Sequence, residues 1–417
     1  MDKENNVVTN SSGSRASNFF EIPATEVYSL YFQDNISLRK ENAYYLLKLG
    51  ARYDNMLKKY NLLSPRLSAS AKFFDKYRVR AAYGVSYRAP SVSQLHPAPN
   101  YFDVINLNHY SSEEIRSLAV ATTYIYQPVN DHIEPSKGTT YEVGIDYENN
   151  GYSFLLTGFH KELKNGIVSV SQLLSFDKRI WESTGEIPGQ ATVVVPTDDV
   201  VRISSSFTGY RNTVTTKTNG LEYSMQFPKI KATNTTINLS GSFLWTERQD
   251  ESLALRSSIS FSSSPQNRYG LYEKPTYLNL TGRSTLTIAQ HFPEIRMLLT
   301  FRTEISWIKK QEVSVSPSPY ALAFYELDGS YHEIPEDERA SSKYENLRYP
   351  VEYLNQSPEP TYFNFHLQLR KEMKQGHTFS FFVNNFLWYN PSYKNNINQN
   401  LFLNSRVTFG VGLNFKI

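Results

Sequence analysis

The chain has 417 residues, of which 14% are aromatic, including 30 tyrosines and 25 phenylalanines, and 20% are charged. Its formal net charge of +3 gives no reason to expect a nucleic-acid partner, and the absence of cysteine excludes disulfides and thiolate metal sites. The mean hydropathy is −0.47, and no run of about 20 apolar residues could form a membrane-spanning helix. A soluble β-rich protein and a membrane β-barrel, in which only alternate residues face lipid, both remain possible.

Alternating apolar and polar residues predict about thirteen β-strands. In chain order they lie at residues 25–38, 43–54, 66–73, 76–88, 137–148, 152–164, 217–228, 235–248, 277–289, 295–308, 361–371, 378–389 and 403–415. Most of them reach the roughly 9–11 residues that a tilted strand needs to cross a bilayer. The repetition of this pattern favours an all-β, antiparallel transmembrane β-barrel.

The connections between these strands are predicted to alternate between short turns and long loops. Short periplasmic turns and long extracellular loops are typical of outer-membrane barrels. Residues 1–24 are rich in Ser, Asn and Thr and are predicted to be irregular, and residues 25–417 form the barrel portion. The long extracellular loops are predicted at residues 89–136, 165–216, 249–276 and 310–360.

Charged residues recur on the polar side of the predicted strands. Arg78 and Arg80 lie on one face of a single strand, which is costly in a soluble core but suits a hydrated lumen. The residues predicted to face the lumen or a plug are Arg52, Arg78, Arg80, Glu142, Asp146, Glu222, Arg302 and Arg406. These residues could form only a salt-bridged, hydrated wall, or they could also line the path of a permeating ligand.

Three tryptophans provide an independent indication of the membrane boundary. Trp245, Trp307 and Trp388 each lie near the end of a strand that leads into a long loop. Aromatic side chains gather at both interfaces of membrane proteins, so we expect these three in an aromatic girdle.

No motif in the sequence indicates an enzyme, a cofactor or a metal site, so we predict no catalytic or metal-ligating residue. The acidic residues at 333–339 could hold calcium through hard oxygen ligands, but a solvated loop is the more ordinary interpretation. Cationic and aromatic side chains in and beside the first long loop are candidate ligand contacts. They are Arg88, His96, Tyr101, His109 and Tyr110.

The order and spacing of several short motifs resemble the TonB-dependent outer-membrane receptors. The segments are Tyr31-Phe32-Gln33-Asp34-Asn35-Ile36, Leu49-Gly50-Ala51-Arg52-Tyr53-Asp54, Ser64-Pro65-Arg66-Leu67-Ser68, Tyr83-Gly84-Val85-Ser86-Tyr87-Arg88-Ala89-Pro90-Ser91, Glu134-Pro135-Ser136-Lys137, Tyr141-Glu142-Val143-Gly144 and Asn219-Gly220-Leu221-Glu222. Asn384-Asn385-Phe386 and Pro391-Ser392-Tyr393 are similar to receptors of the Bacteroidetes type.

Receptors of this family have barrels of 22 strands that enclose an internal plug. The resemblance therefore implies that the thirteen predicted strands correspond to the C-terminal part of such a barrel, with the plug absent. Residues 1–20 lack the apolar core of a signal peptide, which fits the same expectation. The odd number of predicted strands also fits part of a larger barrel, because complete bacterial single-chain barrels have an even number of strands.

The resemblance implies the ligand-binding and translocating barrel of a TonB-dependent receptor in the outer membrane of a Gram-negative cell. Its ligand would be a scarce nutrient: a siderophore, haem, cobalamin, a glycan or a peptide. The implied partners are outer-membrane lipid, a plug-bearing N-terminal part, the TonB complex acting through that plug, and a surface lipoprotein. A passive 14-stranded outer-membrane porin or adhesin, and a soluble β-rich binding protein, are the alternatives.

Overall fold

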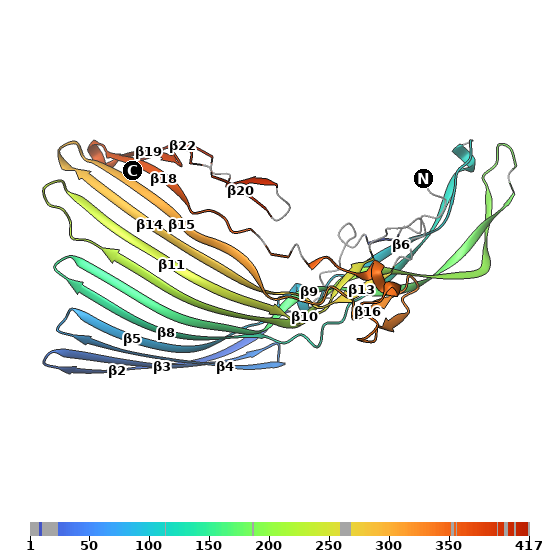
Figure 1. Ribbon diagram of the computed structural model, residues 1–417, viewed down its shortest axis with the longest axis horizontal. Coiled ribbons are helices and arrows are strands. Elements are labelled where there is room, and N and C mark those ends of the chain that lie inside the picture. The colour runs from blue at the N-terminus through green and yellow to red at the C-terminus, as the bar shows by residue number, and fades with distance from the viewer. Residues whose placement is uncertain are drawn as a thin grey trace.

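The computed structural model describes residues 8–10 and 24–415, apart from residues 113, 186, 259–267, 352–353, 356, 390, 396–398 and 404–405. Within these residues, thirteen strands form one antiparallel sheet in which spatial order follows chain order (Figure 1). They are β2 (Val27–Lys40), β3 (Ala43–Met56), β4 (Tyr60–Phe73), β5 (Tyr77–Arg88), β8 (Ser136–Asn149), β9 (Tyr152–Gly185), β10 (Val193–Gln226), β11 (Thr235–Asp250), β14 (Thr276–Phe292), β15 (Met297–Val315), β18 (Tyr362–Glu372), β19 (Thr378–Asn384) and β22 (Thr408–Asn414). The predicted all-β, antiparallel fold is confirmed. No helix in the described part of the chain is long and apolar enough to cross a membrane.

One face of this sheet, the apolar face, carries aliphatic side chains in continuous cross-strand rows. Ile36, Leu47, Ala69, Ala81 and Val143 are successive partners from β2 to β8. Ile36 is 51% exposed and Val143 is 59% exposed, so no other part of the described chain covers this row. An apolar surface that continues over so many strands indicates contact with a membrane or a partner.

Aromatic rows flank these aliphatic rows. Tyr77 and Tyr147 have ring centroids 5.1 Å apart, and six residues along β5 the pair Tyr83 and Tyr141 repeats the same separation. The second row continues through His160 on β9 and the non-aromatic Asn219 on β10 to Trp245, which is 43% exposed. Two aromatic rows on either side of an aliphatic band are typical of the girdles of membrane barrels.

The other tryptophans agree less uniformly with the predicted girdle. Trp307 is 44% exposed and lies where β15 has a bulge against β14. Its indole Nε1 donates a hydrogen bond to the Ser284 hydroxyl at 2.6 Å. Trp388 follows β19 rather than ending a strand, and it has a positive φ of 45°.

Strands occupy much of the four segments that the sequence analysis assigned to long loops. β9 and β10 are 34 residues each and fill most of 165–216 as one extended hairpin, which runs far beyond the neighbouring strands in Figure 1. The segment 89–136 forms β6 (Asn100–His109) and β7 (Leu118–Tyr126), and residues 8–10 add β1 (Val8–Asn10) to β6. The rest of the predicted irregular segment, residues 1–7 and 11–23, lies outside the described residues.

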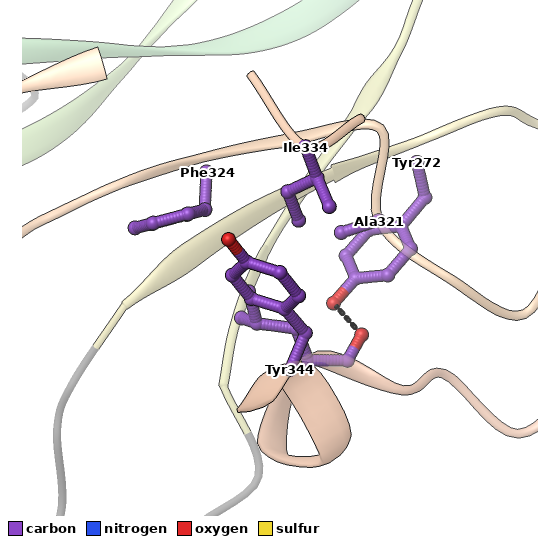
Figure 2. Packing of buried hydrophobic residues seen from close by; sticks show 6 residues of the cluster. Tyr272, Ala321, Phe324, Ile334 and Tyr344 are labelled. Atoms are coloured by element: carbon purple, nitrogen blue, oxygen red, sulfur yellow. Dashed lines mark hydrogen bonds between the residues drawn. The ribbon is translucent and has the colours of Figure 1, made fainter. Parts of the chain in front are cut away.

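The other two predicted loops fold together into a second small sheet. It consists of β12 (Ala254–Ser257), β13 (Tyr269–Tyr272), β16 (Ala323–Tyr325) and β17 (Tyr331–Glu333). Figure 2 shows its small core, in which Tyr272, Phe324 and Tyr344 pack with Ile334, and the Tyr272 hydroxyl donates to the Leu347 carbonyl. Burial raises the pKa of the Tyr272 hydroxyl to about 12, so it remains a donor at physiological pH.

These two small sheets pack against the extended part of the β9–β10 hairpin, and we call the assembly the head. Phe102 of β6 lies 4.7 Å from Phe176 of β9, between ring centroids, and is fully buried. On the other side of the hairpin, the turn between β16 and β17 approaches so closely that a Cβ on Gly329 would lie 1.8 Å from the Ser175 hydroxyl oxygen. Gly329 also has a φ of +85°, which favours glycine. The hairpin is therefore the middle layer of a three-layered head.

A partly buried carboxylate connects the large sheet to the head. Asp250, at the end of β11, accepts hydrogen bonds from Thr213, Ser252 and Lys274, the last at 2.7 Å. Burial alone would raise the pKa of Asp250, but the bonds from Lys274, Ser252 and Thr213 outweigh burial and lower it. The ionised Asp250 side chain thus connects loop 251–253, through Ser252, to the segment just before β14, through Lys274.

We expect Asp250→Asn to destabilise the head by about 1–3 kcal/mol, because Lys274 loses its charged partner while partly buried. A lowered pKa in the folded state means that Asp250 stabilises the fold above its unfolded pKa of about 3.9 and loses this effect as the pH falls through the folded value. The difference in thermal stability between wild type and variant should therefore become smaller as the pH falls from about 5 to about 2. A constant difference over that range would contradict the assignment to Asp250.

Candidate functional site

The face opposite the apolar face, the polar face, is the candidate functional site. Strand register places seven of the eight residues predicted to face the lumen on it. They are Arg52, Arg78, Arg80, Glu142, Asp146, Glu222 and Arg302. The eighth, Arg406, is exposed and lies two residues before β22 begins. Whether this face contacts a lumen or a plug remains a prediction.

On this face, Arg80 of β5 and Asp146 of β8 form an ion pair. Arg80 donates from Nε to the Asp146 carboxylate at 3.2 Å and from its terminal nitrogen to the Thr157 hydroxyl. Its guanidinium lies across Gly144, where a Cβ would be 2.7 Å from the Arg80 Cζ. Glycine at position 144 therefore leaves the space through which Arg80 reaches both acceptors.

A second polar group lies on β15, β18 and β19. The Glu304 carboxylate contacts Arg302 on its own strand and lies 3.7 Å from His366 Nε2 on β18. His366 Nδ1 lies 3.1 Å from the Asn384 side-chain oxygen. The charged side chains of these two groups therefore have partners, as expected for a hydrated, salt-bridged wall.

A hollow of about 500 Å³ interrupts this wall between β2 and β9. Its floor is made by residues with little or no side chain, including Gly50, Gly84 and Ala82. Gly50 and Gly84 lie on either side of the Arg66 stem, which is 3.9 Å and 3.8 Å from the positions where their Cβ atoms would be, so a Cβ at either position would make an ordinary contact with it. The hollow therefore results from small residues on β3 and β5 on either side of a long one on β4.

The hollow has an excess of positive charge. Lys48, Arg66 and Lys161 line it together with a single carboxylate, Glu142. None of the three cations has a salt bridge to another described residue. Lys161 instead lies 4.4 Å above the ring of Phe159. Unpaired cations around a polar hollow favour an anionic occupant.

A family model described as TonB dependent receptor-like, beta-barrel matches residues 2–386. The chain belongs to this family. Among curated proteins, the chain is 27% identical over 144 residues to the ferric enterobactin receptor PirA of Pseudomonas aeruginosa, covering 34% of this chain and 18% of that receptor. It is 22% identical over 236 residues to the ferrienterobactin receptor of Escherichia coli, covering 55% and 29%. These relatives are receptors rather than enzymes.

Two solved TonB-dependent receptors share the fold at a TM-score of 0.50. The siderophore receptor PirA from Acinetobacter baumannii is 16% identical and is matched over 92% of this chain and 45% of its own. A ferric enterobactin receptor mutant from Pseudomonas aeruginosa is 15% identical, with 93% and 44% covered. The chain thus spans less than half of the length of each of these receptors. Its similarity to receptors of the Bacteroidetes type stays a prediction.

In this receptor chain, the five predicted ligand contacts do not form one site. Tyr101 and His109 lie at opposite ends of β6, about 27 Å apart at the usual rise of a strand. Arg88 ends β5, His96 follows the short helix α1 (Val92–Leu95), and Tyr110 is 70% exposed beyond β6. Sequence reasoning missed Lys48, Arg66 and Lys161 as a group, although their strand register with Gly50 and Gly84 could have revealed it.

Proposed function

We propose that the chain forms part of the barrel wall of an active outer-membrane importer in a Gram-negative cell and that its polar face lines the path of the ligand. Membership of the TonB-dependent receptor family supports this function. The observation that carries the proposal is the polar hollow, in which Lys48, Arg66 and Lys161 have no acidic partner among the described residues.

Among a siderophore, haem, cobalamin, a glycan and a peptide, we propose a ferric siderophore as the ligand. The curated relatives are named as receptors for ferric enterobactin. An iron chelate with anionic oxygen ligands is complementary to a cationic hollow, whereas a neutral glycan is not. Arg88 at the end of β5 and Tyr110 beyond β6 would then meet the ligand before the hollow does.

The proposal includes further strands and a plug, because the large sheet is open. Among the described residues, β2 pairs only with β3, and β22 pairs only with β19. All fourteen residues of β2 are exposed, including Leu30 at 72% and Phe32 at 65%. Additional strands at both edges would complete a barrel of 22, and a plug within it would connect the ligand to the TonB complex. A surface lipoprotein over the head remains a further proposed partner.

Ligand titration of the purified receptor tests the function. We expect Lys48→Gln, Arg66→Gln and Lys161→Gln together to weaken binding of ferric enterobactin at least tenfold, since each charge-assisted contact is worth about 1.5–3 kcal/mol. Lys231→Gln removes a cation from the exposed turn between β10 and β11, away from the hollow, so it is the control and should leave affinity unchanged. Equal affinity in wild type and triple variant would contradict the proposal. A steady ion conductance through the wild type in planar bilayers would instead favour the passive porin.

A further inference from the structure

A second hollow, of about 410 Å³, lies on the apolar face and has no role in the proposed transport. Its floor consists of three alanines on β4 and β5, namely Ala69, Ala71 and Ala81. Larger apolar side chains from four strands stand around this floor. They are Ile36, Leu38, Tyr45, Leu47, Val79 and Val143.

The shape of this hollow follows from strand register. Ala69 lies between Leu47 on β3 and Ala81 on β5, and Val143 closes that row on β8. In the next row, Ala71 lies between Tyr45 and Val79. The strands on either side of β4 are about 9.5 Å apart, because neighbouring strands are spaced by about 4.8 Å. Alanine on β4, together with Ala81 on β5, therefore leaves a trench that is bounded by Tyr45 and Val79 in one row and by Leu47 and Val143 in the other.

One end of the trench carries groups that suit a lipid headgroup. Beyond Ala71, the next row contains Lys40, Ala43, Phe73 and Tyr77 as successive partners from β2 to β5. Lys40 is exposed and has no salt bridge to a described residue. A cation beside aromatic rings, at the end of an apolar trench, is complementary to a phosphate attached to an acyl chain.

We propose that the trench binds one diacyl phospholipid, with an acyl chain on Ala69 and Ala71 and the phosphate beside Lys40. This inference rests on the proposed membrane placement of the apolar face. It goes beyond general contact with lipid, because a hollow with walls on both sides holds one molecule in place while a flat surface exchanges its lipids freely. The ligand is a structural lipid of the wall and not the transported molecule.

Native mass spectrometry of the membrane-purified protein, stripped in detergent and titrated with dioleoyl phosphatidylglycerol, tests this inference. We expect wild type to retain one phosphatidylglycerol. Filling the trench with Ala69→Leu and Ala71→Leu should lower its affinity at least tenfold, and Lys40→Gln should lower it about threefold to tenfold. Ala51→Leu introduces the same side chain on the apolar face outside the trench and should change nothing.

Each variant is co-produced with a polypeptide that carries the proposed further strands, and heat-modifiable migration of the complex in a detergent gel establishes that it is folded. Leu47→Ala removes a wall instead of filling the trench and should also weaken retention, so the result does not depend on one kind of change. Equal retention by the filled variant and by Ala51→Leu would overturn the inference, as would retention of lipopolysaccharide in place of the phospholipid. A protein that inserts and binds its siderophore but retains no lipid would refute the lipid site alone.

Discussion

Ala81→Arg should destabilise the membrane-inserted protein by about 2–4 kcal/mol, the cost of an arginine on the lipid face near the bilayer midplane. Ala81 lies on the apolar face between the two aromatic rows, with Ala69 and Val143 as its cross-strand partners. An arginine there has no polar group within its row to accept a hydrogen bond. Equilibrium unfolding by urea in lipid vesicles measures the change in free energy.

The adjacent residue supplies a matched control. Ala82 has the same side chain on the same strand but lies on the polar face, where its partners are Ser68 and Glu142. Ala82→Arg places the new cation beside a carboxylate and water, so we expect a change below about 1 kcal/mol. Similar losses of stability at both positions would show that the faces have been assigned wrongly.

The chain produced by itself should not form a closed, heat-modifiable barrel. β2 and β22 each have one edge without a partner strand in the described sheet. In a bilayer, each unpaired backbone group costs several kcal/mol, so these edges must pair with other strands or aggregate. Co-production with a polypeptide that carries the proposed further strands and plug should give a protease-resistant complex, detected by its heat-dependent migration in detergent gels.

Hydrogen exchange gives this prediction an internal control. Amides of β4, which has partners on both sides, should be protected with or without the added polypeptide. Amides of β2 that point away from β3 should become protected only in the complex. A monomer from this chain alone in which β2 is already protected would favour the porin alternative and contradict the open sheet.

The strands of the large sheet were predictable because their alternation is strict where each face meets a different environment. The ends of the strands beside residues 55–65, which lie between the predicted strands 43–54 and 66–73, were not predictable. β3 and β4 continue to a turn at 57–59, in which Leu57 and Lys58 both have a φ of 55°, a conformation that neither residue type indicates. Pro65 also obscured β4, and it is tolerated because the pairing of β4 with β5 begins only at Arg66.

The head could not be foreseen from periodicity. Each face of the extended parts of β9 and β10 is covered by a different segment, since Ser175 and Ser204 face the β16–β17 turn while Phe176 faces β6. Contacts between segments far apart in sequence, such as Phe102 with Phe176, determine these strands. Local propensity is a weak guide in such a case.

The candidate site was predictable in part. Alternation indicates which face carries Arg80 and Asp146, but their ion pair depends on the glycine at 144 and on the register of β5 with β8. In the cationic hollow, Arg66 likewise lies between Gly50 and Gly84 across three strands. Cross-strand neighbours of this kind are fixed by register, which the sequence does not display.

The accessibility of spin labels along β5 tests directly whether one face of the sheet lies in lipid and the other in water. The absence of native cysteine allows one label at each position from 77 to 88. In membranes, oxygen collides preferentially with labels in lipid, and a water-soluble nickel chelate with labels in water. We expect two oscillations with a period of two residues and opposite phase, with oxygen favoured at Val79 and Ala81, which are exposed on the apolar face. Oscillations in the same phase, or high nickel accessibility at these two positions, would contradict a sheet with one face in lipid and the other in water.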